Sequence, residues 1–266
     1  MQINALSTVI DHLHDEDFPR LFVNFTRSVL RFDHALILAY HGKTAPHLLF
    51  KDYSTPSVEK TIPDYMTAAY MLDPIFEAHL GKIPPGLYRL EDLTADHFRR
   101  SSYYKSYYQQ TGNRDELVIL TSSGSGYSLA FSLLRGSNLP QRFTKTEEKV
   151  LRQLTPLLCA LMQQHWQNFS DLPKIPDEQT PDPLSPRIKS AFQKHHGLAL
   201  TDRQAEIIAL ILRGHSSFSI GILLGISSET VKTHRRNIYN RLRISSQSQL
   251  FNLTIQAIGP LVPHAR

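Results

Sequence analysis

The sequence lacks the features that mark a membrane or secreted protein. No run of about eighteen apolar residues occurs along the chain, so no membrane-spanning helix is predicted. Residues 1–18 carry acidic side chains where a signal peptide needs positive charge. The single cysteine, Cys159, cannot form an internal disulfide bond, which is typical of a reducing compartment. We therefore expect a cytoplasmic protein with no membrane association.

Motifs of enzymes and metal sites are also missing. The Ser/Gly run at 122–126 lacks the Lys and the following helix of a phosphate-binding loop, and it is typical of a hairpin turn. His195 and His196 have no cysteine or acidic partner at metal-ligand spacing. No nucleophile elbow or zinc-hydrolase motif is present. We therefore expect no catalytic activity, no cofactor and no metal site.

Charge is unevenly distributed along the chain. Residues 187–266 hold 11 Lys and Arg against 3 Asp and Glu, whereas residues 1–186 hold 18 basic and 21 acidic residues. A strongly basic C-terminal part favours a polyanionic partner for that part alone. Between them, residues 171–186 hold five of the sixteen prolines. This composition predicts a linker at 171–186 between a domain at 1–170 and a smaller domain at 187–266.

The N-terminal domain has the pattern of a mixed fold. Apolar residues at helical spacing alternate with short β-rich runs. Thr144 and Glu147 form a capping-box pattern at the start of a last helix. The expected elements are two helices within 5–31, strands at 34–42 and 47–54, a helix at 57–81, two strands within 116–135 and a helix from Thr144. Helices flanking an antiparallel sheet predict a layered, sensor-like α+β domain.

The C-terminal domain reads as consecutive helices with clear start and stop signals. Thr201 and Gln204 form a capping box, and Gly214 is a natural helix end. Ser216 or Ser217 can cap a second, short helix that closes at Gly225. Ser227 can then cap a third helix, SETVKTHRRNIYNRLR. A short helix, a tight turn and a longer basic helix form a helix-turn-helix arrangement.

The third helix has an apolar face and a polar, basic face. Val231, Ile238 and Leu242 fall on one side by spacing. The other side presents the amides, hydroxyls and guanidinium groups that read base edges in the DNA major groove, with flanking cations that suit phosphates. The candidate DNA contacts are Ser217, Thr230, Lys232, Thr233, His234, Arg235, Arg236, Asn237 and Arg241.

The run from Leu200 to Leu250 resembles the C-terminal module of LuxR-type transcription regulators. The resemblance is carried by Leu200-Thr201, Arg203, Glu206, Gly214, Ser216, Ile220, Leu224 to Ser227, Thr230 to Lys232, His234, Asn237 to Tyr239 and Leu242. It implies an all-α four-helix module whose third helix, about 228–242, enters the major groove. One departure is Gly221, where the family usually has alanine, and glycine weakens a helix by roughly 0.5–1 kcal/mol.

The resemblance also implies partners. A fourth helix at about 246–258 would dimerise, with Leu250, Leu253, Thr254 and Ala257 as candidates for its contact face. A two-fold homodimer would read a pseudo-palindromic operator in double-stranded DNA. RNA polymerase is a further candidate partner.

Residues 65–88 and 102–134 resemble the acyl-homoserine-lactone-binding domain of quorum-sensing regulators. Asp73-Pro74 match its Asp-Pro pair, but the Trp and Tyr ahead of that pair are not at matching spacing. The resemblance therefore implies a GAF- or PAS-like α/β/α sensor fold and an effector other than a standard acyl-homoserine lactone. The candidate ligand contacts are Tyr65, Tyr70, Asp73, Tyr88 and Phe131. Asp73 as a helix cap, with the aromatic residues as core, is the alternative.

Together these features predict a DNA-binding transcription regulator controlled by a small molecule in the N-terminal domain. The alternative is a ligand-independent regulator of the same type, whose N-terminal domain is a dimerisation or protein-interaction module. An enzyme with an appended DNA-binding module is the third hypothesis, and no motif supports it.

Overall fold

The computed structural model describes residues 2–53, 62–67, 69–106, 108–123, 126–136, 138–139, 141–167 and 184–258. The chain forms two compact units. Unit 1 comprises residues 1–59, 78–93 and 112–177, and unit 2 comprises residues 60–77, 94–111 and 178–266. The predicted linker lies outside the described residues as far as residue 183, and its last three residues belong to a helix. The assignment of separate functions to 1–170 and 187–266 stays a prediction.

Unit 1 is built on a five-stranded antiparallel sheet with the strand order β2-β1-β5-β4-β3. The strands are β1 (His34–Tyr40), β2 (His47–Asp52), β3 (Gly86–Arg89), β4 (Asp115–Ser122) and β5 (Ser128–Arg135). The four longer strands confirm the prediction from sequence. β3 was not predicted, because four residues are too few to show alternation.

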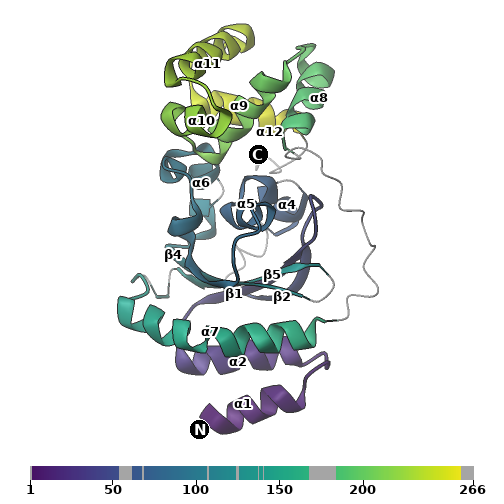
Figure 1. Ribbon diagram of the computed structural model, residues 1–266, viewed down its shortest axis with the longest axis vertical. Coiled ribbons are helices and arrows are strands. Elements are labelled where there is room, and N and C mark those ends of the chain that lie inside the picture. The colour runs from purple at the N-terminus through teal and green to yellow at the C-terminus, as the bar shows by residue number, and fades with distance from the viewer. Residues whose placement is uncertain are drawn as a thin grey trace. The chain divides into compact units, whose positions relative to one another are not determined.

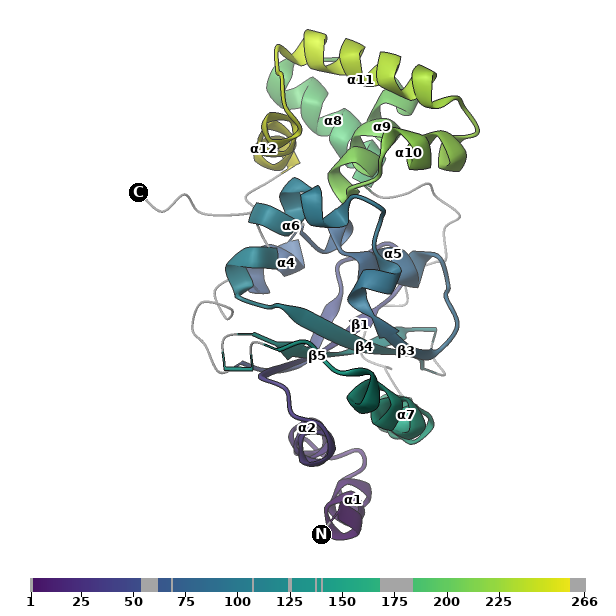
Figure 2. The same cartoon turned by 90° about the vertical axis from the view of Figure 1, so that its left-hand side faces the viewer.

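Three helices of unit 1 lie on one side of its sheet. α2 (Phe18–Val29) and α7 (Lys145–His165) run across that face, and α1 (Gln2–Asp11) lies outside α2 (Figures 1 and 2). Phe22 of α2 and Leu158 of α7 pack with Phe131 of β5 in one apolar core. The predicted capping box of Thr144 and Glu147 is present at the start of α7. The α+β prediction is therefore confirmed.

The single helix predicted at 57–81 is wrong within its described part. That part holds α4 (Ile62–Thr67), the 3-10 helix η1 (Ala69–Leu72) and α5 (Pro74–Leu80). The break follows from Asp73, whose Oδ1 accepts the Ile75 N–H at 2.7 Å and so caps α5, while Pro74 has no N–H to donate. Periodicity alone did not reveal this interruption. Further short elements follow as η2 (Leu90–Leu93), η3 (Phe98–Arg100), α6 (Ser102–Ser106) and η4 (Tyr108–Thr111).

The C-terminal part of unit 2 is all helical. Its helices are α8 (Leu184–His196), α9 (Asp202–Arg213), α10 (Ser217–Leu224), α11 (Ser228–Leu242) and α12 (Gln247–Ile258). α9 to α12 confirm the four predicted helices, and α8 precedes them. Among the described residues, no helix combines the length and the hydropathy needed to cross a membrane.

Candidate nucleic-acid interface and ligand site

The α10–α11 pair is fixed by caps and by two buried side chains. Gly225 ends α10 with φ 64°, and Ser227 caps α11 by accepting the Thr230 N–H at 3.0 Å. Val231 and Ile238 are fully buried, and α11 packs against α10 and α9. The apolar face predicted from spacing is therefore the face that joins α11 to the rest of unit 2.

The opposite face of α11 is open to solvent. Thr230 and Arg236 are exposed, while His234 and Arg235 are partly buried. The remaining exposed candidates on this helix are Lys232, Thr233, Asn237 and Arg241. Figures 1 and 2 show α11 along the outer side of the C-terminal helices. A polar, basic helix face left free in this way has the geometry that a major-groove reader needs.

Three of the basic candidates already have protein partners. Arg241 donates to the Ala199 carbonyl at 3.0 Å and to Gln204 Oε1 at 3.3 Å. Arg235 donates to Ser217 Oγ at 3.3 Å, which joins two of the candidate contacts. Lys232 forms an exposed ion pair with Glu229 at 2.6 Å. These bonds orient the guanidinium groups of Arg235 and Arg241, whereas an exposed pair such as that of Lys232 stabilises little.

The structure explains the glycine at position 221, which the sequence alone did not. A Cβ at this position would lie 2.8 Å from the Ile226 carbonyl oxygen and 3.3 Å from the Ser228 nitrogen. The Gly221 carbonyl also accepts the Ile226 N–H at 2.9 Å. The glycine therefore lets α10 approach the turn that leads into α11. Its weak helix propensity is offset by this close contact.

The predicted contact face of α12 is wrong for three of its four residues. Leu250, Thr254 and Ala257 are buried inside the chain, where α12 packs against α8. Leu253 is partly buried. Helical spacing identified an apolar face correctly, but it does not tell which neighbour covers that face. The outward side of α12 carries polar residues instead, namely Ser248, Gln249, Asn252 and Gln256.

Asp73 is the chemically most distinctive of the candidate ligand contacts. Burial raises the pKa of its carboxyl group from 3.8 to about 6, although hydrogen bonds from the Ile75 N–H, Tyr65 and Tyr103 oppose the rise. Tyr65 and Asp73 are thus brought together, and their contact with a ligand stays a prediction. Tyr103 is not among the candidates from sequence, because spacing does not reveal a contact between residues 30 positions apart. Tyr70 is buried, with its ring 4.9 Å from that of Phe76 in an edge-on arrangement.

Tyr88 and Phe131 belong to unit 1 and lie on opposite faces of the sheet. Phe131 pairs with Ile119, and Tyr88 pairs with Val118, so the two side chains alternate to different sides. Phe131 packs in the core against Phe22, with ring centroids 5.0 Å apart. We correct the prediction for Phe131, which is a core residue; strand alternation alone does not say which face a helix layer covers. Tyr88 donates to the Pro84 carbonyl at 2.7 Å.

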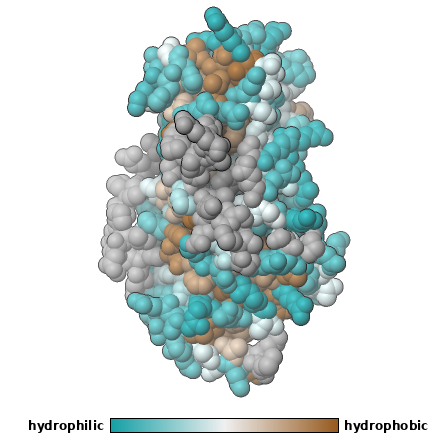
Figure 3. Space-filling model, turned by 180° about the vertical axis from the view of Figure 1, so that it is seen from behind, coloured by the Kyte–Doolittle hydropathy of each residue, from teal (hydrophilic) through white to brown (hydrophobic). Residues whose placement is uncertain are grey.

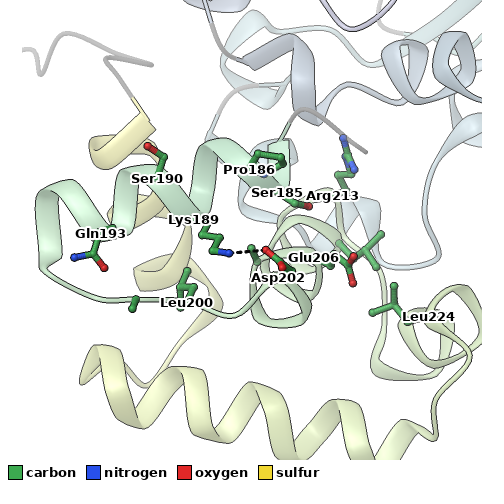
Figure 4. A pocket seen from close by; sticks show the side chains of 13 residues that line it. Ser185, Pro186, Lys189, Ser190, Gln193, Leu200, Asp202, Glu206, Arg213 and Leu224 are labelled. Atoms are coloured by element: carbon green, nitrogen blue, oxygen red, sulfur yellow. Dashed lines mark hydrogen bonds and ion pairs between the residues drawn. The ribbon is translucent and has the colours of Figure 1, made fainter. Parts of the chain in front are cut away.

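A groove of about 780 Å³ lies in unit 2 between α8 and α9. Leu200, Ala205 and Leu224 contribute to its apolar lining, and the ion pair of Lys189 and Asp202, at 2.7 Å, stands at its side (Figure 4). None of the five candidate ligand residues lines this groove. In the space-filling view from behind, an apolar patch lies among hydrophilic residues near the top of the picture (Figure 3).

No group of three or more His, Cys, Asp or Glu side chains in the described ranges is placed to hold a metal ion.

Comparisons with known proteins agree with the helical geometry. A family model described as bacterial regulatory proteins of the luxR family matches residues 198–254. An HTH-type transcriptional regulator from the exeN 3' region of Aeromonas salmonicida is 30% identical over 187 residues, which cover 68% of this chain and 92% of that protein. The chain belongs to the LuxR family of HTH-type transcriptional regulators. It is accordingly a DNA-binding regulator of transcription and not an enzyme.

Two further likenesses each cover more than half of the chain. The monoamine regulon transcriptional regulator of Klebsiella aerogenes is 24% identical over 196 residues, or 74% of this chain and 73% of that protein. The LBD domain of VqsR from Pseudomonas aeruginosa is 21% identical, with a TM-score of 0.52, and the match covers 61% of this chain and 94% of that one. The second likeness supports the fold of the N-terminal part, including its antiparallel sheet.

Proposed function

We propose that this LuxR-family regulator binds a pseudo-palindromic operator as a homodimer and that a small molecule held at Asp73 controls it. The observation that supports the DNA-reading role is the division of α11 into a buried apolar face and an exposed polar face. The observation that supports an effector is a partly buried carboxyl group with a raised pKa.

On the exposed face of α11 we assign two roles. Thr230, Thr233, Arg236 and Asn237 contact base edges, because hydroxyls, amides and guanidinium groups match the donor and acceptor pattern of the major groove. Lys232, Arg235 and Arg241 contact phosphates, which position the helix and make binding depend on salt. Ser217 and His234 flank this surface.

The test of this assignment is selection of binding sites from a random duplex pool, followed by titration of single-base variants. Arg236→Ala is expected to relax preference at one base position by about 1–3 kcal/mol. Lys232→Ala is the matched control, and it should weaken binding to all duplexes about equally and lower the salt dependence. If Arg236→Ala weakens specific and non-specific duplexes by the same factor, Arg236 does not read bases.

The effector site is proposed around Asp73, Tyr65 and Tyr103. A buried carboxyl group requires hydrogen-bond donors, so the expected effector carries an amide or amine N–H. The test is a thermal-shift screen of metabolites with such donors on the full-length protein, repeated with Asp73→Asn. A compound that raises the midpoint only in the wild type supports the site, whereas shifts of equal size in both proteins place the effector elsewhere.

A second candidate function is ligand-independent regulation. It is favoured by the hydrogen bonds that Asp73 already accepts from Ile75, Tyr65 and Tyr103, since these bonds are sufficient for a structural role. In that case no compound shifts the midpoint, and the protein binds its selected duplex as a dimer without addition of any effector.

A further inference from the structure

Two short stretches from the N-terminal half belong to the same compact unit as the DNA-binding helices. Residues 60–77 and 94–111 group with residues 178–266 in unit 2. The proposed effector contact Asp73 is therefore in the unit that contains α11. Side chains of unit 2 join the Asp73 turn to these helices.

Arg213, the last residue of α9, makes the central contact. It is only 5% exposed, and its Nε lies 3.1 Å from Oε1 of Glu77. Its Nε and Nη2 also donate to the Met71 carbonyl at 3.2 and 3.1 Å. A buried guanidinium is stable only when it is paired and hydrogen bonded. Met71 and Glu77 stand on either side of Asp73 in the chain, so Arg213 holds both flanks of that turn.

A second contact secures the link between α9 and α10. The Gly214 carbonyl accepts the His97 N–H at 2.9 Å, and the Ser216 N–H donates to Asp96 Oδ1 at 2.9 Å. A Cβ on Gly214 would lie 2.8 Å from the Phe98 Cα. The link between α9 and α10 therefore contacts residues 96–98 directly, through a backbone hydrogen bond to His97 and the side chain of Asp96.

The Asp73 turn is tightly bonded within itself. The Asp73 N–H donates to the Tyr70 carbonyl at 3.0 Å, and the Glu77 N–H donates to the Asp73 carbonyl at 3.2 Å. The Asp73 side chain accepts the Ile75 N–H at 2.7 Å. A change at the carboxylate therefore reaches the backbone at residues 70–77, which includes Met71 and Glu77, the partners of Arg213 described above.

We propose that Arg213 is a positioning residue that transmits the state of the Asp73 carboxylate to the DNA-binding helices. This proposal rests on the proposed function, in which Asp73 contacts the effector. A group that neutralises or hydrogen-bonds Asp73 alters the turn, and Arg213 carries that change to the start of α10, which packs against α11. Coupling between two sites is reciprocal, so DNA binding changes the Asp73 turn by the same free energy.

The test is a double-mutant cycle on the full-length protein that needs no effector. Asp73→Asn supplies the neutral state of the carboxylate. Arg213→Met removes the bonds to Glu77 and Met71 while keeping most of the side-chain volume. The readout is the Kd for a fluorescein-labelled random-sequence duplex at low salt. Asp73→Asn is expected to change this Kd by about fivefold or more in the wild type, and by less than about twofold in Arg213→Met. Equal changes in both backgrounds, or no change in either, overturn the proposal.

Arg203→Met is the matched control. Arg203 is on the same helix, but its pair with Glu206, at 3.0 Å, is partly exposed. The effect of Asp73→Asn should persist in that background. If Arg213→Met does not fold, Glu77→Gln removes the charge partner and leaves the Met71 bond. It must then reduce the effect of Asp73→Asn as well, and an undiminished effect contradicts the proposal.

Hydrogen exchange adds a readout that a merely structural arginine would not move. Adding the duplex should slow exchange in residues 69–77 of the wild type and leave it unchanged in Arg213→Met. The metabolite screen separates this proposal from the proposed function. If the cycle is non-additive and no metabolite binds, the role of Arg213 stands and the effector hypothesis fails. If a metabolite binds and the cycle is additive, the effector hypothesis stands and the role of Arg213 fails.

Discussion

The helices at 184–258 and the short elements at 62–111 differ in what sets their ends. α9, α10 and α11 each begin at a Ser or Thr whose side chain accepts a backbone N–H three residues on, and α9 and α10 end at glycines with positive φ. The elements described between 62 and 111 are at most seven residues long. The first region is defined by local hydrogen bonds, whereas the second depends on tertiary contacts such as those of Arg213.

The largest expected effect on stability distinguishes the buried face of α11 from its exposed face. Ile238→Ala should lower the free energy of unfolding by about 2–5 kcal/mol, because Ile238 is fully buried against the rest of the unit. Its neighbour Asn237 is exposed, and Asn237→Ala should change stability by less than about 0.5 kcal/mol. Urea unfolding of both variants checks the prediction. Similar losses would mean that α11 has no free face.

Gly214→Ala tests the contact between the two regions within unit 2. Its φ of 95° and the 2.8 Å approach to Phe98 both oppose a Cβ, so a loss of about 2–4 kcal/mol is expected. Gly197 also has positive φ, at 61°, but no atom lies within 4 Å of its Cβ position. Gly197→Ala should cost only about 1 kcal/mol. Equal losses of stability in thermal or urea unfolding would contradict a steric contact between a Cβ at position 214 and Phe98.

Gly221→Ala sets local propensity against packing. Alanine in place of glycine favours a helix by about 1 kcal/mol, whereas the contact with the Ile226 carbonyl opposes it by about 1–3 kcal/mol. We expect a net destabilisation of about 1 kcal/mol, measured by urea unfolding. A more stable Gly221→Ala protein would show that the α10–α11 turn adjusts freely.

A further test concerns pH and the Asp73 turn. The folded pKa of about 6 exceeds the ordinary value of 3.8, so the unfolded chain releases this proton first as pH rises. The contribution of Asp73 to stability is therefore present below pH 3.8 and is lost by about pH 6. The stability of the wild type minus that of Asp73→Asn should fall across this window and then stay constant. A difference independent of pH contradicts the raised pKa.

Much of the C-terminal fold could be predicted because its signals are local. Thr201, Ser216 and Ser227 cap helices by bonding to nearby backbone, and a sequence shows such pairs directly. The sequence does not show which surface covers an apolar face, so the role of Leu250 was misplaced. The roles of Arg213 and Tyr103 depend on contacts with distant residues, and spacing carries no signal of such contacts.

The most direct measurement compares two isosteric charge changes on exposed amides of unit 2. Asn237→Asp adds a negative charge to the outer face of α11, and Gln193→Glu adds one to α8. Because the new charge of Asn237→Asp would lie beside phosphates, this variant should weaken binding to a selected duplex by about tenfold or more. Gln193→Glu should change binding by less than about threefold. Equal losses, or tight binding by Asn237→Asp, would contradict DNA reading by α11.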